Sequence, residues 1–197
     1  MRVLSILASS LALFLTACAS SPPPAQANSA NQNRAIDTYS RDEMVEVTAD
    51  FFGVTAEVAA SAIERVFADL GRPNGYIAGE EVSGAIGVGL RYGEGNMSIK
   101  GQPEPRKVYW QGPSIGFDTG GNASKVFTLV YNIRDGERIY QRFPGVEGSA
   151  YLVAGLGVNY QRADGITLAP IRSGVGLRAG ANVGYLAYSR RRNWIPF

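Results

Sequence analysis

The chain has 197 residues, 45% of them hydrophobic, a composition typical of one globular domain with or without a tail. Its formal net charge of +2 is too small for the concentrated basic footprint of a nucleic-acid-binding protein, so no nucleic-acid partner is expected. The sequence holds no histidine and one cysteine, which excludes Ser-His-Asp triads, Cys-His nucleophile pairs and imidazole metal sites. We therefore expect no metal and no other cofactor.

The N-terminus has the features of an export signal. A positive start at Arg2 precedes an apolar run over residues 3–15, which is too short to span a bilayer as a helix. Residues 15–18 read Leu-Thr-Ala-Cys and resemble the lipobox of bacterial lipoproteins, in which the bond before the cysteine is cut and its thiol is acylated. We expect residues 1–17 to be removed and Cys18 to be lipidated. The alternative is an ordinary signal peptide with an incidental cysteine.

The segment over residues 18–36 is predicted to be a disordered tether. It contains three consecutive prolines, and residues 19–35 include no large apolar side chain, so the segment cannot bury enough surface to order itself. The acyl chains on Cys18 would hold the protein to a membrane. Because Ala19 and not aspartate follows the cysteine, the likeness to Gram-negative lipoproteins favours the periplasmic face of the outer membrane.

Helical signals begin at Ser40, which forms a capping box with Glu43. Apolar residues then recur at spacings of three and four as far as residue 70, and Gly71 is a natural C-terminal cap. Gly53 leaves open whether the segment is one helix or two. Both choices give a helical layer with one apolar side that must pack on another layer.

The rest of the chain reads as short strands separated by Gly, Pro, Asn and Asp. Apolar residues alternate with other residues over 85–92, 152–160 and 174–185, and glycine recurs on the opposite face. Glycine weakens strands, so we expect strong coiling or close approach of another backbone there. Residues 125–131 are apolar on both faces and predict a central strand, whereas residues 135–143 predict one short helix.

These elements predict an α+β fold that is mainly β, in which residues 37–197 form a single periplasmic β-barrel-like domain. We expect a small antiparallel barrel or sandwich of the eight-stranded type, packed against the N-terminal helical layer. Residues 37–69 hold eight acidic residues against two arginines, and residues 165–197 hold five arginines and no acid. We expect these two ends of the chain to attract each other; the alternative is an anionic partner for the arginines at 190–192.

Two motifs resemble nucleotide-binding or catalytic motifs, but their positions and spacing do not fit those functions. The pattern G-V-G-L-R-x-G occurs at 87–93 and 174–180, but within predicted strands, whereas a dinucleotide fingerprint opens a helix. Glu80 and Glu81 are adjacent, so a strand would place them on opposite faces and not as a catalytic carboxylate pair. We therefore expect no enzymatic activity. The alternative is a periplasmic hydrolase that uses carboxylates brought together by folding and acts on an envelope polymer.

Several longer motifs resemble the EipA-type envelope-integrity family of Gram-negative bacteria, a domain of unknown biochemical function. They include GRPNGYI at 71–77, VYWQGPSIG at 108–116 and APIRSGVGLR at 169–178. The resemblance covers about residues 36–197 and implies a periplasmic β-barrel of about eight strands that helps to keep the envelope intact. It supplies no catalytic residues, and the lipobox departs from typical members, which look freely secreted.

A weaker likeness is to the SYLF lipid-binding module, in which an Arg-x-Gly-x-Gly turn, as at 91–95, also precedes a tryptophan and a Pro-Ser pair. Together these resemblances predict a non-enzymatic periplasmic lipoprotein that binds lipid, lipopolysaccharide or another envelope component. We expect Arg91, Tyr109 and Trp110 to form the lipid- or partner-binding surface, because aromatic rings suit a lipid or glycan boundary and arginine pairs with phosphate. The alternative is that Trp110 is a core residue and Arg91 a solvated strand residue.

Overall fold

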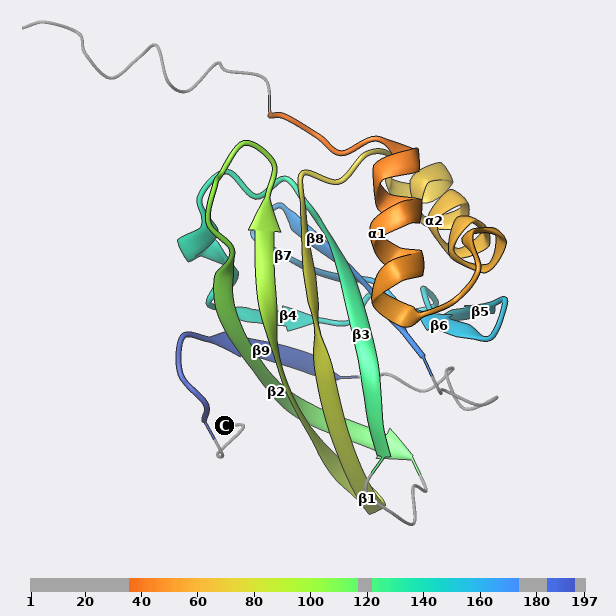
Figure 1. Ribbon diagram of the computed structural model, residues 1–197. Coiled ribbons are helices and arrows are strands. Elements are labelled where there is room, and N and C mark those ends of the chain that lie inside the picture. The colour runs from red at the N-terminus through yellow and green to blue at the C-terminus, as the bar shows by residue number, and fades with distance from the viewer. Residues whose placement is uncertain (1–35, 117–121, 174–183, 194–197) are drawn as a thin grey trace, which may run out of the picture. The chain divides into compact units, whose positions relative to one another are not determined.

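The computed structural model describes residues 36–116, 122–173 and 184–193 of the chain (Figure 1). The predicted signal peptide, Cys18 and the tether as far as residue 35 lie outside these residues. Most of the strand predicted over 174–185 lies outside them as well.

Two helices precede the sheet, α1 (Arg41–Phe52) and α2 (Ala56–Leu70). The predicted capping box is present, because the Ser40 side chain accepts a hydrogen bond from the Glu43 backbone and the Glu43 side chain accepts one from the Ser40 backbone. Gly53 ends α1 in the left-handed conformation at φ 69°, so the segment divides into two helices at that residue. Neither helix in the described part of the chain is long and apolar enough to cross a membrane.

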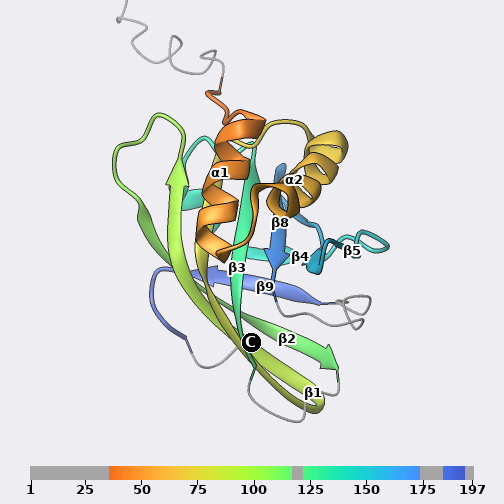
Figure 2. The same cartoon turned by 45° about the vertical axis from the view of Figure 1, so that its right-hand side comes forward.

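In the described residues, a single sheet of nine antiparallel strands follows, in the order β4-β9-β2-β1-β3-β8-β6-β5 with β7 paired to β8. The sheet curls into a half-barrel, and both helices lie beside β3 and β8 on its outer face (Figures 1 and 2). The strands are β1 (Gly75–Ile99), β2 (Arg106–Gly116), β3 (Asn122–Tyr131), β4 (Arg142–Pro144), β5 (Tyr151–Val153), β6 (Leu156–Val158), β7 (Gln161–Ala163), β8 (Ile166–Arg172) and β9 (Tyr185–Ser189). The predicted fold class, α+β and mainly β, is confirmed.

Strand β1 turns back on itself and supplies two neighbouring positions of the sheet. Its first half pairs with β3, with Gly75 opposite Val130, and its second half pairs with β2, with Gly93 opposite Trp110. The two halves lie side by side, since a Cβ atom placed on Gly79 would be only 2.2 Å from the Glu94 carbonyl oxygen. Figure 1 shows this reversal at the end of β1 away from the helices.

The sheet separates two apolar cores. The inner core fills the half-barrel, and its members include Ile77, Met97, Val108, Phe143 and Leu168. The outer core joins the sheet to the helices, and its members include Ile63, Val66, Phe127, Leu129 and Ile171. Strand β3 contributes to both cores, as predicted for a central strand, because its alternate side chains face opposite sides of the sheet.

Two local predictions need correction. Residues 152–160 do not form one strand: β5 and β6 form a hairpin whose turn residues, Ala154 and Gly155, have φ values of 49° and 82°. Two residues at positive φ make the turn type that best fits the twist of a hairpin. The helix predicted over 135–143 is confirmed only as the 3-10 turn Gly136–Ile139, because Phe143 belongs to β4.

Glycine occupies the inner face of β1 because the Trp110 ring lies against it. A Cβ atom on Gly93 would be 2.1 Å from Cε2 of Trp110, and one on Gly79 would be 2.8 Å from its Cη2. Leu90, on the opposite face, is exposed. The glycine-bearing face of β1 is therefore the interior face. Glycine is needed there because the Trp110 ring and the neighbouring backbone approach it closely, as the sequence analysis expected.

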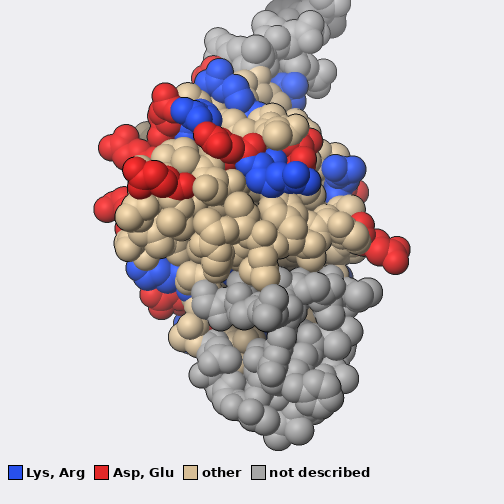
Figure 3. Space-filling view, turned by 90° about the vertical axis from the view of Figure 1, so that its right-hand side faces the viewer, with Lys and Arg blue, Asp and Glu red and all other residues tan. Residues whose placement is uncertain are grey.

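The predicted attraction between the acidic helices and the C-terminal arginines is wrong for the pairs in the described part of the chain. Acids of the sheet and its loops pair with these arginines: Arg172 with Glu81, Arg190 with Glu137 and Arg192 with Glu94. Helical acids pair mostly with nearby cations: Glu43 with Lys100, Glu64 with Arg41 and Asp69 with Arg65. Figure 3 shows acidic and basic side chains intermixed at the helical end, above a band of uncharged residues.

We predict that Gly93→Ala destabilises the fold by about 1–3 kcal/mol, because the new methyl group overlaps the Trp110 ring. Urea unfolding followed by circular dichroism measures the loss. In a Trp110→Leu background the same substitution is expected to cost less, since the ring is gone. Gly184→Ala is the control, as its methyl group would make an ordinary contact with Pro113 at 3.4 Å. An equal cost of Gly93→Ala in both backgrounds contradicts this explanation.

Candidate functional site

A buried carboxylate and two arginines meet inside the half-barrel. Glu81 is 3% exposed, and its Oε1 accepts a hydrogen bond from Nε of Arg172 at 3.1 Å. Its Oε2 accepts a hydrogen bond from Nε1 of Trp110 at 2.8 Å. Nη1 of Arg91 lies 3.6 Å from Oε1 of Glu81. We call Glu81, Arg91 and Arg172, with Trp110 and Asn159, the inner cluster.

Strand alternation brings these residues together from distant parts of the sequence. Glu81 lies two and four residues after Gly79 and Ile77, so it points to the inside as Ile77 does. Arg172 is the last residue of β8, whose inward positions Ile166 and Leu168 belong to the inner core. Arg91 comes from the second half of β1. The inner cluster therefore joins both halves of β1 to β2 and β8.

Two arginine charges keep the buried carboxylate of the inner cluster ionised. Burial raises the pKa of Glu81, but the charges of Arg172 and Arg91, with the hydrogen bonds from Trp110 and Arg172, outweigh burial and hold that pKa below its usual value. Arginine does not release its proton inside proteins. Among the described residues, two guanidinium groups thus share one carboxylate.

The polar side chains of Asn159 and Tyr188 beside these ion pairs are neutral. Asn159 accepts a hydrogen bond from Nη1 of Arg172 at 2.6 Å but carries no charge. Burial raises the pKa of Tyr188, so its hydroxyl stays protonated. Nη2 of Arg172 is buried and has no hydrogen-bond acceptor in the described structure. The described residues contain no group of three or more side chains suited to bind a metal ion.

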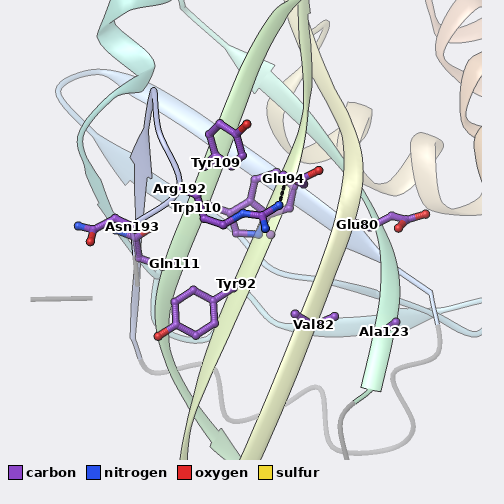
Figure 4. A pocket seen from close by; sticks show the side chains of 11 residues that line it. Glu80, Val82, Tyr92, Glu94, Tyr109, Trp110, Gln111, Ala123, Arg192 and Asn193 are labelled. Carbon is purple, nitrogen blue, oxygen red and sulfur yellow. Dashed lines mark hydrogen bonds and ion pairs between the residues drawn. The ribbon is translucent and has the colours of Figure 1, made fainter. Parts of the chain in front are cut away.

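A second feature is a groove of about 230 Å³ on the outer face of β1 and β2. Figure 4 shows Tyr92 and Tyr109 on one side of it and Val82 and Ala123 on the other, with Arg192 running between them. We call this the outer groove.

Two charged residues of the outer groove, Arg192 and Glu94, are held in ion pairs. Arg192 pairs with Glu94, and its guanidinium carbon lies 5.9 Å from the centre of the Tyr109 ring. Hydrogen bonds from Arg192 and Lys107 lower the pKa of Glu94, so this carboxylate stays ionised at neutral pH. The outer groove therefore offers aromatic and apolar surface beside a positioned arginine.

The surface predicted from Arg91, Tyr109 and Trp110 is found only in part, because Tyr109 and Trp110 both line the outer groove and Arg91 does not. Trp110 is 2% exposed and lies in the inner core, so the alternative placement as a core residue fits the geometry. Arg91 joins it in the inner cluster, and its side chain is 11% exposed. Tyr109 lines the outer groove, because consecutive strand residues face opposite sides of a sheet.

Sequence reasoning missed Glu81 and Arg172 as partners. A sequence signal does exist for Arg172. It ends the strand ITLAPIR, whose other residues are almost all apolar, and a charge in such a strand indicates a buried partner. For Glu81, the same alternation that separates it from Glu80 also directs it inward. Nothing in the sequence joins the two residues, which lie 91 positions apart.

Comparison with known proteins agrees with the fold. A family model described as envelope integrity protein A matches residues 37–197. The chain belongs to the envelope integrity protein A family. The crystal structure of a beta-barrel-like, uncharacterized protein from Brucella abortus is similar, with 48% sequence identity and a TM-score of 0.72. The match covers 82% of this chain and 99% of that chain, and no curated protein matches. Membership in the envelope integrity protein A family points to a role in the cell envelope.

We predict that Glu81→Gln lowers the free energy of unfolding by about 3–5 kcal/mol at neutral pH, because it removes the charge of a buried carboxylate that Arg172 and Arg91 both contact. Urea denaturation measures the change. Glu80→Gln is the matched control, since Glu80 is exposed on the opposite face. Equal stability of the two variants would show that the carboxylate does not balance the arginines.

The pH dependence of stability tests the same ion pairs. The pKa of Glu81 is lower in the folded than in the unfolded chain, so its contribution is complete above the unfolded value of about 4.3. This contribution is lost as the pH falls through the lower folded value. The free energy of unfolding of Glu81→Gln is therefore expected to fall less as the pH is lowered through this range. Glu80→Gln is expected to show the same fall as the unmodified protein.

Proposed function

We propose that this domain is a non-enzymatic binding module of the cell envelope that holds an anionic lipid or lipopolysaccharide at the outer groove. The observation that carries the proposal is the combination of exposed apolar and aromatic side chains with a positioned arginine on one face of the sheet. Family membership supplies the envelope setting.

The apolar part of the outer groove suits an acyl chain. Val82 is 52% exposed and Leu90 is 36% exposed, on neighbouring halves of β1. Soluble domains rarely leave neighbouring large apolar side chains uncovered unless that surface binds something. Tyr92 and Tyr109 add rings with an apolar body and a polar tip, which suit the boundary between acyl chains and head groups.

The charged part of the outer groove suits a phosphate-bearing head group. Arginine presents a planar set of donors that matches phosphate geometry. A head group at the outer groove would share Arg192 with Glu94, and Arg191, the preceding residue of the chain, is exposed.

Hydrolysis by paired carboxylates is the competing function, and one observation favours it: Glu80 and Glu94 both line the outer groove. Such an enzyme needs one carboxyl group that stays protonated until it donates its proton. Glu94 is unsuited to that role because its ion pairs hold it ionised. Glu80 points away from Glu94 (Figure 4). These features support binding over hydrolysis.

Binding to vesicles tests the proposal, with Cys18→Ser in every variant so that no acyl chain contributes. The double variant Val82→Asp with Arg192→Gln is expected to lose at least tenfold in co-sedimentation with phosphatidylglycerol vesicles. The matched control is Leu152→Asp with Arg65→Gln, which changes an exposed leucine and an exposed arginine away from the outer groove. Equal binding by both double variants, or equal binding to phosphatidylcholine vesicles, contradicts the proposal.

We also propose that the mature protein begins at a lipidated Cys18, tethered to the periplasmic face of the outer membrane. The support is the sequence Leu-Thr-Ala-Cys at 15–18, followed by the proline-rich segment. Intact mass spectrometry of protein from host membranes is expected to show a chain that starts at Cys18 and carries acyl groups. Cys18→Ser should release a folded domain from the membrane fraction. A mature N-terminus elsewhere, or one without acyl groups, overturns the proposal.

A further inference from the structure

A buried glutamine lines the outer groove. Gln111 is 4% exposed, and it faces the outer groove as Tyr109 does, two residues before it on β2. In the part of the chain that the structure describes, its side-chain amide makes no hydrogen bond. Buried polar groups in native proteins are almost always paired, and the groove of about 230 Å³ leaves room for a ligand atom beside this amide. The Gln111 amide therefore points to a ligand that can both donate and accept hydrogen bonds.

Two carboxylates of the outer groove limit the chemistry of that ligand. Glu80 and Glu94 both line the outer groove, and hydrogen bonds from Arg192 and Lys107 hold Glu94 ionised. An ionised carboxylate only accepts hydrogen bonds. The oxygens of a phosphate also accept, so a phosphate alone would suit Arg192 and would leave these carboxylates without donors. A ligand that fits the whole outer groove therefore carries hydroxyl groups.

The tyrosines of the outer groove favour a ligand in the form of a ring. Tyr109 lies opposite Glu94, and Tyr92 lies opposite Gln111, in the register of β1 and β2. Each aromatic ring thus has a hydrogen-bonding side chain directly across the strand pair. A pyranose sugar matches this arrangement, because its faces consist of C–H groups and its rim carries hydroxyl groups. The groove of about 230 Å³ is smaller than the roughly 300–1,000 Å³ of sites for drug-sized ligands, so it suits a single sugar ring.

We infer that the outer groove holds a pyranose ring with equatorial hydroxyl groups, as the head group of a glycolipid. The inference rests on the proposed function and names its ligand more narrowly. The Gln111 amide donates to one hydroxyl group and accepts from its neighbour, Glu94 accepts from another, and the Tyr109 ring packs against a C–H face. The exposed Val82 continues the apolar surface at the groove and suits the acyl chains, which favours a glycolipid over a sugar polymer.

Vesicle co-sedimentation of the full chain with Cys18→Ser tests the inference. The three kinds of vesicle are phosphatidylcholine alone, phosphatidylcholine with monoglucosyl diacylglycerol, and phosphatidylcholine with phosphatidic acid. The glucolipid offers a sugar without a phosphate, and phosphatidic acid offers a phosphate without a sugar. We expect at least tenfold stronger binding to the glucolipid vesicles than to phosphatidylcholine alone. Equal binding to these two kinds of vesicle overturns the inference.

Variants assign the sugar response to the outer groove. Gln111→Leu is expected to reduce glucolipid binding to the level of phosphatidylcholine alone and to leave binding to phosphatidic acid unchanged. Gln161→Leu is the matched control, because Gln161 is also a strand glutamine that is 4% exposed, but it lies on β7. Should Gln111→Leu not fold, Tyr109→Leu serves as the second variant, with at least tenfold weaker glucolipid binding expected. Full glucolipid binding by a folded Gln111→Leu or Tyr109→Leu chain overturns the inference.

A soluble sugar chain distinguishes a glycolipid from a polysaccharide. Maltotriose is expected to bind at least tenfold more weakly than the glucolipid vesicles in isothermal titration calorimetry. Equally tight binding of maltotriose would overturn the assignment to a glycolipid and would assign the outer groove to a polysaccharide.

Failure of the inference differs from failure of the proposed function. If the glucolipid adds nothing while phosphatidylglycerol binding still depends on Val82 and Arg192, the inference alone is refuted. If glucolipid binding needs Gln111 while phosphatidylglycerol binding is independent of Val82 and Arg192, the proposed binding of a phosphate-bearing lipid alone is refuted.

Discussion

The Trp110 ring against the glycine-bearing inner face of β1 is the contact on which the rest of the half-barrel depends. Gly79 and Gly93 have only hydrogen atoms where the indole ring lies, and the two halves of β1 approach each other closely beside it. A large flat ring can pack there only because both positions lack a Cβ atom. The ring also carries the N–H group that reaches Glu81. Packing and charge placement are therefore coupled at one side chain.

The carboxylate of Glu81 determines how the strands on either side of β1 are held. It receives hydrogen bonds from Trp110 on β2 and Arg172 on β8, and Arg91 reaches it from the second half of β1. A carboxylate in this position must be compensated, because burial alone would favour its neutral form. The charges of Arg172 and Arg91 provide this compensation.

The two faces of the sheet present different chemistry. The outer face is covered by α1 and α2 beside β3 and β8, whereas β1 and β2 carry the outer groove with its tyrosines and exposed valine. The inner face is mainly apolar around the inner cluster. The outer groove places an arginine beside apolar and aromatic groups, and the proposed binding function rests on this combination.

The sequence by itself determined the local elements and the fold class. Helix capping depends only on neighbouring residues. The capping residues Ser40, Glu43 and Gly53 therefore indicated from the sequence where the helices begin and end. Side-chain alternation likewise predicted a curved antiparallel sheet with β3 at its centre, and the long motifs indicated the envelope-integrity family. Local reasoning was wrong at the hairpin of Ala154 and Gly155, because an alanine at positive φ gives no turn signal in the sequence, and it overestimated the length of the helical turn at Gly136–Ile139.

The candidate sites were decided by the tertiary structure alone. Alternation shows that Tyr109 and Trp110 face opposite sides, but it does not say which side is the interior, since the inner face of β1 carries glycine where a core residue is expected. Glu81 and Arg172 are 91 residues apart, and they meet only because β3 lies between the first half of β1 and β8 in the sheet. Strand order and the direction of curling depend on the packing of the whole chain. No local pattern could therefore place two arginines on one buried carboxylate.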